Sequence, residues 1–368
     1  MAALLKDLYS PAFYNNFANV LAQVLPGFEQ QQFISAIFDE TFASKELKER
    51  MRHTAQVLHQ FFPKDFAQAA TLIRQLITQL RQNGIQEFSI EYMFLPDYIE
   101  TYGLNDFNSA VNTMELVTQF TSCEFAVRPF LLKYGDRMLQ QMTAWSLHEN
   151  HKVRRLASEG TRPRLPWAMA IPALKKDPSP VLPILENLKQ DPSEFVRRSV
   201  ANNLNDIAKD HPDIVIDIAA KWRGLSKETD AIIKHGCRTL LKQGHTAILT
   251  YYGLQSNNIS LKDFTIATPT VAIGESLVFS FSLTNNNSTA QMIRLEYAIY
   301  YKRQNGQLSK KVFKISEKVY QPREKVVVQR RQSFKPITTR RFYTGQQQVS
   351  IIVNGVEKEI KPFQLANK

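Results

Sequence analysis

Apolar residues recur at helical spacing through the first two thirds of the chain, with polar residues between them. A first helix is predicted to begin at Ser10-Pro11, because serine caps helix N-termini and proline is favoured in the first turn. Further helices before residue 127 are predicted over residues 29–42, 45–62, 65–83 and 107–120. A loop is predicted over residues 96–103, where Pro96 and Gly103 interrupt the pattern.

Two predicted helices repeat the sequence Val-Arg-Arg. The first copy begins at Val153 and the second at Val196, so the repeat is 43 residues long. Helical repeats of the HEAT type have periods of about 40–47 residues. A third unit is predicted over residues 214–222 and 232–243. The pattern therefore predicts a solenoid of stacked helix pairs with a concave, basic wall.

A polar face accompanies the apolar face on both copies. Arg155 and Glu159 are four residues apart in the first copy, and Arg198 and Asp206 are eight residues apart in the second. This spacing places each set on one side of its helix, and we expect that side to point away from the core toward a groove. A single charged pair is more often a solvated salt bridge. The repetition of the arrangement, with Trp167 between the two copies, favours a functional site.

The period changes to two after a polar linker at residues 251–258. Seven short strands are predicted over residues 264–267, 276–283, 292–301, 311–315, 325–328, 340–343 and 348–353. Their number and spacing predict an immunoglobulin-like β-sandwich without a disulfide, since this part has no cysteine. The expected fold is therefore multidomain: an α-helical HEAT-like repeat domain at 1–254, followed by an all-β immunoglobulin-like domain at 255–368.

Composition is consistent with a cytoplasmic protein of two domains. A chain of 368 residues is long enough for two sizeable cores. Its two cysteines, Cys123 and Cys237, are far apart and are expected to be free thiols in a reducing compartment. The N-terminus does not read as a signal peptide, and no apolar run approaches the length of a membrane span.

Charge is unevenly distributed along the chain. Residues 1–127 carry 8 basic and 14 acidic side chains, residues 128–255 carry 20 and 13, and residues 256–368 carry 18 and 7. The net charge therefore changes from −6 to +7 and then to +11, which gives a total of +12. Such asymmetry indicates a polyanionic partner. Nucleic acid is favoured over an anionic membrane surface, because no basic amphipathic helix with an exposed aromatic face stands out.

The cations of the repeat region are accordingly candidate DNA contacts. They are Lys152, Arg154, Arg155, Arg162, Arg164, Arg197, Arg198, Lys234 and Arg238. In the C-terminal domain, basic pairs at 310–311, 330–331 and 340–341 indicate a second DNA-contacting module.

Four stretches of the chain, at 47–53, 122–130, 154–167 and 196–206, resemble a known family. They are similar to the AlkC-type DNA-alkylation repair glycosylases of the AlkC/AlkD superfamily. Members of this family have HEAT-like repeats, and one subgroup carries an immunoglobulin-like C-terminal domain. The resemblance implies base excision repair of double-stranded DNA, in which 3-methyladenine and 3-methylcytosine are removed by hydrolysis of the N-glycosidic bond. It also implies that the lesion is reached by bending the DNA rather than by fully flipping the base.

The resemblance assigns roles to five residues of this chain. Asp206 matches the catalytic aspartate, Trp167 matches a tryptophan that contacts the sugar, and Glu124 and Glu159 match two acidic groups of the same cleft. Arg155 matches a DNA-contacting position. The chemistry agrees, because a cationic base is an activated leaving group and fixed carboxylates stabilise an oxocarbenium-like sugar.

No lysine is obviously placed as a Schiff-base nucleophile, so the expected enzyme is monofunctional and leaves an abasic site. No cofactor or metal is expected, since His148 and His151 have poor spacing for a metal site and no phosphate-binding motif occurs. We expect the protein to act as a monomer, without a membrane partner, and to associate with the bacterial nucleoid when it is bound to DNA.

Two other functions remain open from the sequence. The first is a DNA-structure-binding HEAT protein without glycosylase activity, and the intact set of Asp206, Trp167, Glu159 and Glu124 argues against it. The second is a protein-binding HEAT scaffold, which leaves the basic residues of the repeats unexplained. DNA binding that weakens steeply with added salt would separate this second alternative from the DNA-binding functions.

Overall fold

The computed structural model describes residues 4–85, 90–254, 257–337 and 340–367. The chain divides into two compact units. Unit 1 comprises Met1–Val215 and Lys221–Gly236, and unit 2 comprises Ile216–Ala220 and Cys237–Lys368. We predicted a boundary between residues 254 and 255; by packing, the last short helices before that point group with unit 2.

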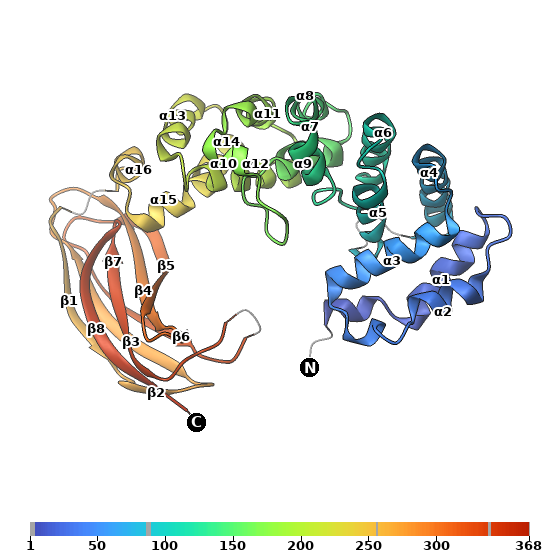
Figure 1. Ribbon diagram of the computed structural model, residues 1–368. Coiled ribbons are helices and arrows are strands. Elements are labelled where there is room, and N and C mark those ends of the chain that lie inside the picture. Colours follow the sequence, from blue (N-terminus) through green and yellow to red (C-terminus); the bar gives the residue numbers. More distant parts are fainter. Residues whose placement is uncertain (1–3, 86–89, 255–256, 338–339, 368) are drawn as a thin grey trace. The chain divides into compact units, whose positions relative to one another are not determined.

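The N-terminal half of unit 1 consists of helices (Figure 1). These helices bury many aromatic side chains. With η denoting a 3-10 helix, these elements are η1 (Leu5–Leu8), α1 (Pro11–Ala22), α2 (Gln30–Ile37), η2 (Phe42–Ser44), α3 (Leu47–Phe61), α4 (Phe66–Gln82), η3 (Ile90–Tyr92), α5 (Phe94–Tyr102) and α6 (Phe107–Val117). Helix α1 begins as predicted, because the Ser10 hydroxyl accepts a hydrogen bond from the Phe13 backbone N–H at 3.3 Å.

Helix α5 lies in the segment that was predicted to be a loop, so that prediction was wrong. Pro96 is the third residue of the helix. In the first turn a backbone N–H has no intrahelical acceptor, so proline costs the helix nothing there. Tyr98 and Ile99 are buried, and this burial stabilises the helix through tertiary packing.

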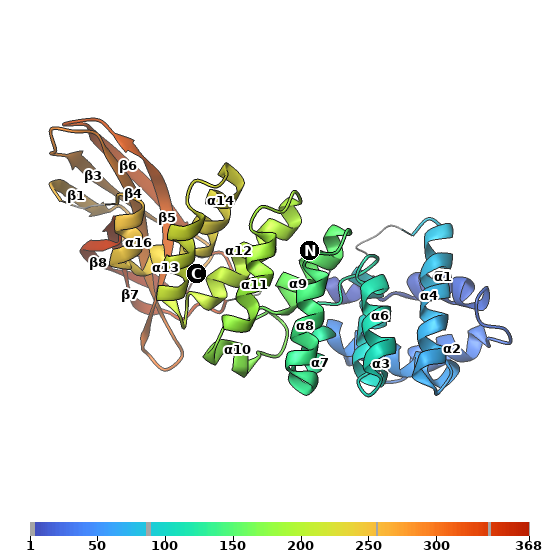
Figure 2. The ribbon, with the colours of Figure 1, turned by 90° about the horizontal axis from the view of Figure 1, so that it is seen from above.

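The 43-residue repeat forms two helix pairs in the second half of unit 1, α8 with α9 and α11 with α12. The elements of this half are α7 (Val127–Tyr134), α8 (Asp136–Trp145), α9 (His151–Gly160), α10 (Pro172–Lys176), η4 (Ser179–Val181), α11 (Leu182–Leu188), α12 (Glu194–Ile207), α13 (Pro212–Trp222) and α14 (Lys227–Gly236). Helix α12 packs between α9 and α14 (Figure 2). Residues of α13 are divided between the two units.

The first arginine of each Val-Arg-Arg copy closes the turn before its own helix. Arg154 Nη1 donates to the carbonyl oxygens of residues 148 and 149, at 2.9 and 2.7 Å. Arg197 Nη1 donates to the equivalent carbonyl oxygens of residues 191 and 192, both at 2.8 Å. Arg154 also pairs with Asp191, with 2.6 Å between Nε and Oδ2, and so joins one repeat to the next. The repeated arginines therefore have a structural role.

Unit 2 contains two short helices and a β-sandwich, which confirms the expected fold class. Its elements are α15 (Arg238–Gln243), α16 (Thr246–Tyr251), β1 (Ile259–Ile266), β2 (Thr270–Ala272), β3 (Ser276–Asn285), β4 (Gln291–Lys302), β5 (Leu308–Tyr320), β6 (Lys325–Ser333), β7 (Gly345–Val353) and β8 (Val356–Ala366). One sheet has the order β1-β3-β6 and the other has the order β2-β8-β7-β4-β5. Strands pair antiparallel except β2 and β8, which are parallel.

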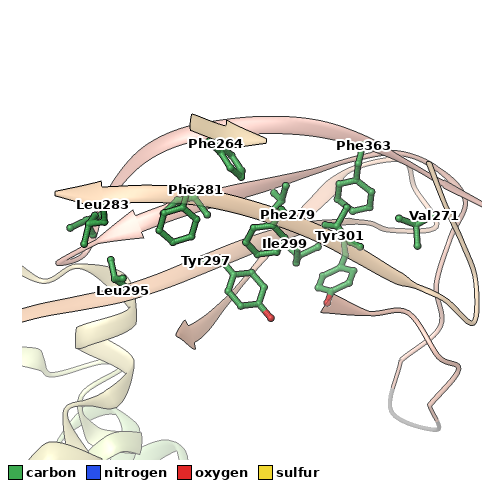
Figure 3. Packing of buried hydrophobic residues seen from close by; sticks show 14 of the residues in the cluster. Phe264, Val271, Phe279, Phe281, Leu283, Leu295, Tyr297, Ile299, Tyr301 and Phe363 are labelled. Atoms are coloured by element: carbon green, nitrogen blue, oxygen red, sulfur yellow. The ribbon is translucent and has the colours of Figure 1, made fainter. Parts of the chain in front are cut away.

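The core of the sandwich is formed by side chains that alternate along the strands. Phe279 and Phe281 of β3, Leu295 and Ile299 of β4 and Phe363 of β8 belong to one buried cluster (Figure 3). This alternation is the signal that made β3, β4 and β7 predictable from the sequence.

Two strand predictions need correction. The strand predicted at 340–343 is absent, and Arg340 makes only an isolated bridge with Ile337. Strands β2 and β8 were missed. In β8 the residues alternate between exposed and half-buried over most of its length, and only Phe363 and Leu365 are fully buried. Such a strand carries little hydrophobic signal, and its position is set by pairing with β7.

A close backbone contact attaches the short helices to the sandwich. A Cβ atom added to Gly244 would lie 2.6 Å from the carbonyl oxygen of Gly355, which is closer than real Cβ atoms approach. Both glycines have positive φ, +73° and +74°. Glycine alone fits at this point, where the turn between α15 and α16 meets the turn between β7 and β8.

Replacing Arg197 with methionine should lower the free energy of unfolding by about 1–3 kcal/mol, because two carbonyl groups lose a charged donor. Arg198→Met is the matched control. Arg198 is the next residue, and it forms an ion pair with Glu194 in which both side chains are exposed to solvent. We expect the control to change stability by less than about 0.5 kcal/mol. Urea unfolding measures both, and equal effects of the two substitutions would contradict the structural role of Arg197.

Candidate active site

Acidic and basic side chains alternate in one chain of ion pairs in unit 1, which we call the charge ladder. Its members, in order, are Glu124, Arg155, Glu159, Arg162, Asp206 and Lys209. At the first end, the Arg155 guanidinium pairs with the Glu124 carboxylate and also donates to Ser122 Oγ at 2.9 Å. Arg155 Nη2 lies 3.7 Å from Glu159 Oε1.

The other end of the ladder surrounds Asp206. Arg162 Nη1 lies 2.6 Å from Glu159 Oε1, and Arg162 Nε lies 2.8 Å from Asp206 Oδ2. Lys209 Nζ lies 2.8 Å from the other oxygen, Asp206 Oδ1. Each oxygen of the Asp206 carboxylate therefore faces its own cation.

Separate elements of the fold position the members of the ladder. Arg155 and Glu159 belong to α9 and Asp206 belongs to the last turn of α12. Glu124 lies in the turn before α7, which begins only at Val127. Because Glu124 is on a turn, its carboxylate is held by Ser122 and Arg155 rather than by a helix N-terminus.

Burial makes the pairing of these charges necessary. Glu159 is 5 % exposed, Arg162 is 7 % exposed and Asp206 is 1 % exposed. Burial by itself favours the neutral form of Arg162, but the Glu159 and Asp206 carboxylates outweigh it and raise the pKa of Arg162 above its ordinary value. A buried charge without a partner is costly, so removing any central member would destabilise the others.

The polar face predicted on α12 is only partly exposed. Arg198 is exposed and pairs with Glu194, and Asn202 is half-buried beside His235. Asp206, by contrast, is buried, so the prediction that it points outward with Arg198 was wrong. Asp206 is buried because the segment 161–171, which follows α9, places Arg162 against the end of α12. We call this segment the Trp167 loop.

Trp167 lies in the middle of this loop and is 62 % exposed. Its backbone is left-handed, with φ of +63°. The indole lines a pocket of about 440 Å³ together with Leu4, Leu5, Lys6, Glu46, Leu47 and Lys48. Among the described residues, no hydrogen bond or ion pair joins Trp167 to a member of the charge ladder, and its carbonyl oxygen accepts from Lys48 Nζ at 2.8 Å. The sequence predicted that Trp167 lies between the two helix copies, and the tertiary structure brings the Trp167 loop next to α3.

The predicted DNA-contacting cations fall into two groups. Lys152 is buried and donates to the Gln119 carbonyl oxygen at 2.7 Å, and Arg154 and Arg197 close interhelical turns as described above. Arg155 and Arg162 are members of the ladder, and Arg164 pairs with Asp210. The second group comprises Arg198, Lys234 and Arg238. Arg198 and Lys234 are exposed, and Arg238 is half-buried. Of the predicted cations, Arg198 and Lys234 are therefore the two that are fully exposed at the surface.

Sequence reasoning did not single out Arg128, although it lies in one of the quoted stretches. Arg128 is fully buried and donates to three backbone carbonyl oxygens of residues 160, 162 and 169, at 2.9, 2.9 and 2.5 Å. Burial, and then the nearby Arg162, lower the pKa of Arg128 to about 10. The only signal in the sequence was an arginine within a helix of otherwise apolar character.

A second pocket, of about 310 Å³, lies between α3, α5 and the Glu124 turn. Phe125 lines it, as do Lys48, Arg52, Asp97 and Glu100. Burial is the largest influence on both carboxyl groups and raises the pKa of Asp97 and of Glu100, although Arg52 pairs with both. This pocket is lined by apolar as well as charged side chains, and Phe125 brings it next to Glu124 at one end of the charge ladder.

Within the described residues, no three His, Cys, Asp or Glu side chains are grouped so that they could hold a metal ion. No helix in the described part of the chain has the length and apolar character that crossing a bilayer requires.

Comparisons with known proteins agree with this architecture. Residues 50–231 match a family model described as DNA alkylation repair enzyme. Residues 260–367 match a model described as the C-terminal Ig-like domain of the uncharacterised protein YhaZ. YhaZ of Bacillus subtilis (strain 168) is 42 % identical over 362 residues, which cover 98 % of this chain and 99 % of that protein.

A solved structure with the same fold is that of the alkylpurine DNA glycosylase AlkC of Pseudomonas fluorescens, bound to DNA containing an abasic site analog. It is 33 % identical, covers 99 % of this chain and 100 % of its own, and has a TM-score of 0.91. The chain belongs to the AlkC-type family of DNA-alkylation repair proteins.

Family membership confirms the resemblance that the sequence indicated. The region that matches the alkylation-repair model includes every member of the charge ladder, Trp167 and Arg128. The AlkC-type fold therefore extends over the complete candidate site, and the sandwich of unit 2 is the family's immunoglobulin-like domain.

Proposed function

We propose that this protein is a DNA glycosylase that removes cationic N3-methylated bases, 3-methyladenine and 3-methylcytosine, from double-stranded DNA. The observation that carries the proposal is the charge ladder, which gathers Glu124, Glu159 and Asp206 from three elements. The relative from Pseudomonas fluorescens, an alkylpurine DNA glycosylase with the same fold, supports this function.

The proposed reaction is hydrolysis of the N-glycosidic bond. Methylation at N3 gives the base a positive charge, so the base leaves as a neutral molecule without a strong general acid. Positive charge then develops on the deoxyribose, and negatively charged groups fixed near the sugar stabilise it. Water attacks C1′ and the product is an abasic site.

The residues of the ladder have distinct roles in this proposal. Asp206 is the catalytic carboxylate, and it orients water and stabilises the charge on the sugar. Arg162 and Lys209 hold the two Asp206 oxygens in place, and such fixed geometry avoids reorganisation during the reaction. Glu159 and Glu124, which belong to the same ladder, add to the negative electrostatic potential near the sugar. Trp167 presents an exposed indole face, which favours cationic character in the sugar.

We propose that the enzyme is monofunctional. Lys209 is the lysine of the ladder, and its amine contacts Asp206 as an ammonium donor, which leaves it a poor nucleophile toward an aldehyde. Treatment of the reaction with borohydride should therefore trap no covalent complex with DNA. A trapped complex that disappears in Lys209→Gln would show instead that the enzyme cleaves the strand through an imine.

We expect Asp206→Asn to lower the single-turnover rate of 3-methyladenine and 3-methylcytosine release by about 100-fold or more, because a fixed charge near the sugar is lost. Asn keeps the size and one acceptor, so Arg162 retains a partner. Asp210→Asn is the matched control, four residues further along and paired with Arg164. Thermal unfolding of both variants confirms that they remain folded.

Two outcomes of that experiment would contradict the proposal. If the wild-type protein binds DNA and releases neither base, the protein is a DNA-structure-binding relative without glycosylase activity. If Asp206→Asn and Asp210→Asn reduce the rate equally, Asp206 has no catalytic role.

We also propose that the sandwich of unit 2 contacts DNA, on the basis of its charge. Arg330 and Arg331 on β6 are exposed, and residues 256–368 have a net charge of +11. Phosphate contacts by such residues would strengthen binding to any DNA sequence and would make it sensitive to salt.

Arg331→Gln should weaken DNA binding uniformly across sequences and reduce the slope of log affinity against log salt concentration by about one. Lys64→Gln is the control with the same change in charge, because Lys64 is exposed and lies in the acidic N-terminal part. Fluorescence anisotropy titrations at several salt concentrations measure both. An unchanged slope for Arg331→Gln would argue against a phosphate contact at this site.

A further inference from the structure

The backbone conformation of Trp167 requires an explanation. Four other non-glycine residues in the described part have positive φ, and three of them are Asn or Asp, which tolerate this region. Trp167 is bulky and has φ of +63°, a conformation that costs about 1–3 kcal/mol. Its side chain is exposed, so core packing does not offset that cost. Other contacts must hold the Trp167 loop in this shape.

Arg128 provides the first of these contacts. Its guanidinium joins the carbonyl oxygens of Gly160 and Arg162, at the start of the Trp167 loop, to that of Met169, near its end. One rigid, planar group thus fixes the distance between both ends of the loop. Lysine could not reproduce this geometry, because its single amine lacks the fork of donors.

The position of Arg128 is costly for stability. The side chain is fully buried, its charge is next to Arg162, and its three hydrogen bonds among the described residues are to backbone carbonyls rather than to carboxylates. Its Nη2 atom has no hydrogen-bond partner among the described residues. A buried cation of this kind is a poor choice for stability alone. Its placement makes sense if the shape of the loop matters for activity.

Lys48 provides the second contact, from a distant part of the chain. It lies in the first turn of α3, and its Nζ donates to the Trp167 carbonyl oxygen at 2.8 Å, across 119 residues of sequence. The same amine lies 4.9 Å from the centre of the Phe125 ring, next to Glu124. Lys48 therefore connects α3, the Trp167 loop and the turn at the end of the charge ladder.

We propose that Arg128 and Lys48 are positioning residues that fix the Trp167 indole where it meets the deoxyribose of the damaged nucleotide. The proposal rests on the glycosylase function above. Arg128 sets the shape of the Trp167 loop, and Lys48 sets the direction of the peptide group that follows the indole.

The three tryptophans of the chain allow a direct measurement of the position of Trp167. Trp145 and Trp222 are each 1 % exposed, whereas Trp167 is 62 % exposed. Iodide in water therefore quenches Trp167 selectively. The nanosecond anisotropy decay of the quenchable fluorescence reports how freely the Trp167 indole moves, and it requires no catalytic activity.

The test compares Lys48→Met and Arg128→Lys with the wild-type protein. We expect the mobile fraction of Trp167 to rise in both variants and the single-turnover rate of base release to fall about 10-fold or more. Affinity for undamaged DNA should stay within about 2-fold, as expected when at most one phosphate contact is lost. Lys48→Arg keeps a donor at this point and should restore both the mobility and the rate.

Lys64→Met is the matched control. Lys64 is also exposed and also donates to a backbone carbonyl, that of His59 near the other end of α3. The Lys64→Met substitution removes the same charge as Lys48→Met, and it should leave the mobility of Trp167 and the rate of base release unchanged.

The outcomes separate this proposal from the proposed function. If the wild-type protein releases no base, the function is wrong, and the anisotropy still decides whether Lys48 and Arg128 fix Trp167. Unchanged mobility in Lys48→Met and Arg128→Lys would overturn the positioning role. If the enzyme is active and Trp167 becomes more mobile while the rate of base release stays the same, the fixed position of Trp167 is not important for catalysis. If Arg128→Lys does not fold, Lys48→Met decides alone, because Lys48 is exposed.

Discussion

Pairing of buried charges is the constraint on which the candidate site depends. Arg162 and Asp206 are almost fully buried, and the ion pair between them offsets part of the cost of burying each charge. Their contact fixes the Trp167 loop against the end of α12. Through Glu159 and Arg155 the same network reaches the turn that carries Glu124. The three carboxylates come from three elements, and a single connected network of ion pairs sets the positions of all three.

The helical repeats provide a frame on which this network is built. Apolar packing of α9 against α12 and of α12 against α14 sets the spacing of the helices, and Arg154 and Arg197 close the turns between them. These interactions repeat with the sequence. The Trp167 loop, by contrast, occurs once, between α9 and α10, and it interrupts the regular stacking. The candidate site therefore lies where an irregular loop meets the regular helices, as is common for loops on rigid scaffolds.

Arginine residues with similar sequence contexts have very different roles here. Arg154 and Arg155 are neighbours, yet the first closes a turn and the second belongs to the charge ladder. Arg128 holds a loop through carbonyl groups, and Arg198 is exposed on the surface. The high positive charge of the chain is therefore not a measure of the positive charge that its surface presents. Many of the basic side chains instead bind carboxylates or backbone carbonyl groups within unit 1.

The sequence by itself determined the two-part architecture, most of the helices and the central strands, because helical and alternating periodicities are local properties. Together with the family resemblance it also led to the prediction that Glu124, Glu159, Asp206 and Trp167 form the site. Only the tertiary structure decided that Asp206 is buried, that Arg154 and Arg197 are structural, and that α5 and β8 form. It also revealed Arg128 and Lys48. The physical reason is that burial and pairing depend on residues far away along the chain, 44 positions apart for Arg162 with Asp206 and 119 for Lys48 with Trp167.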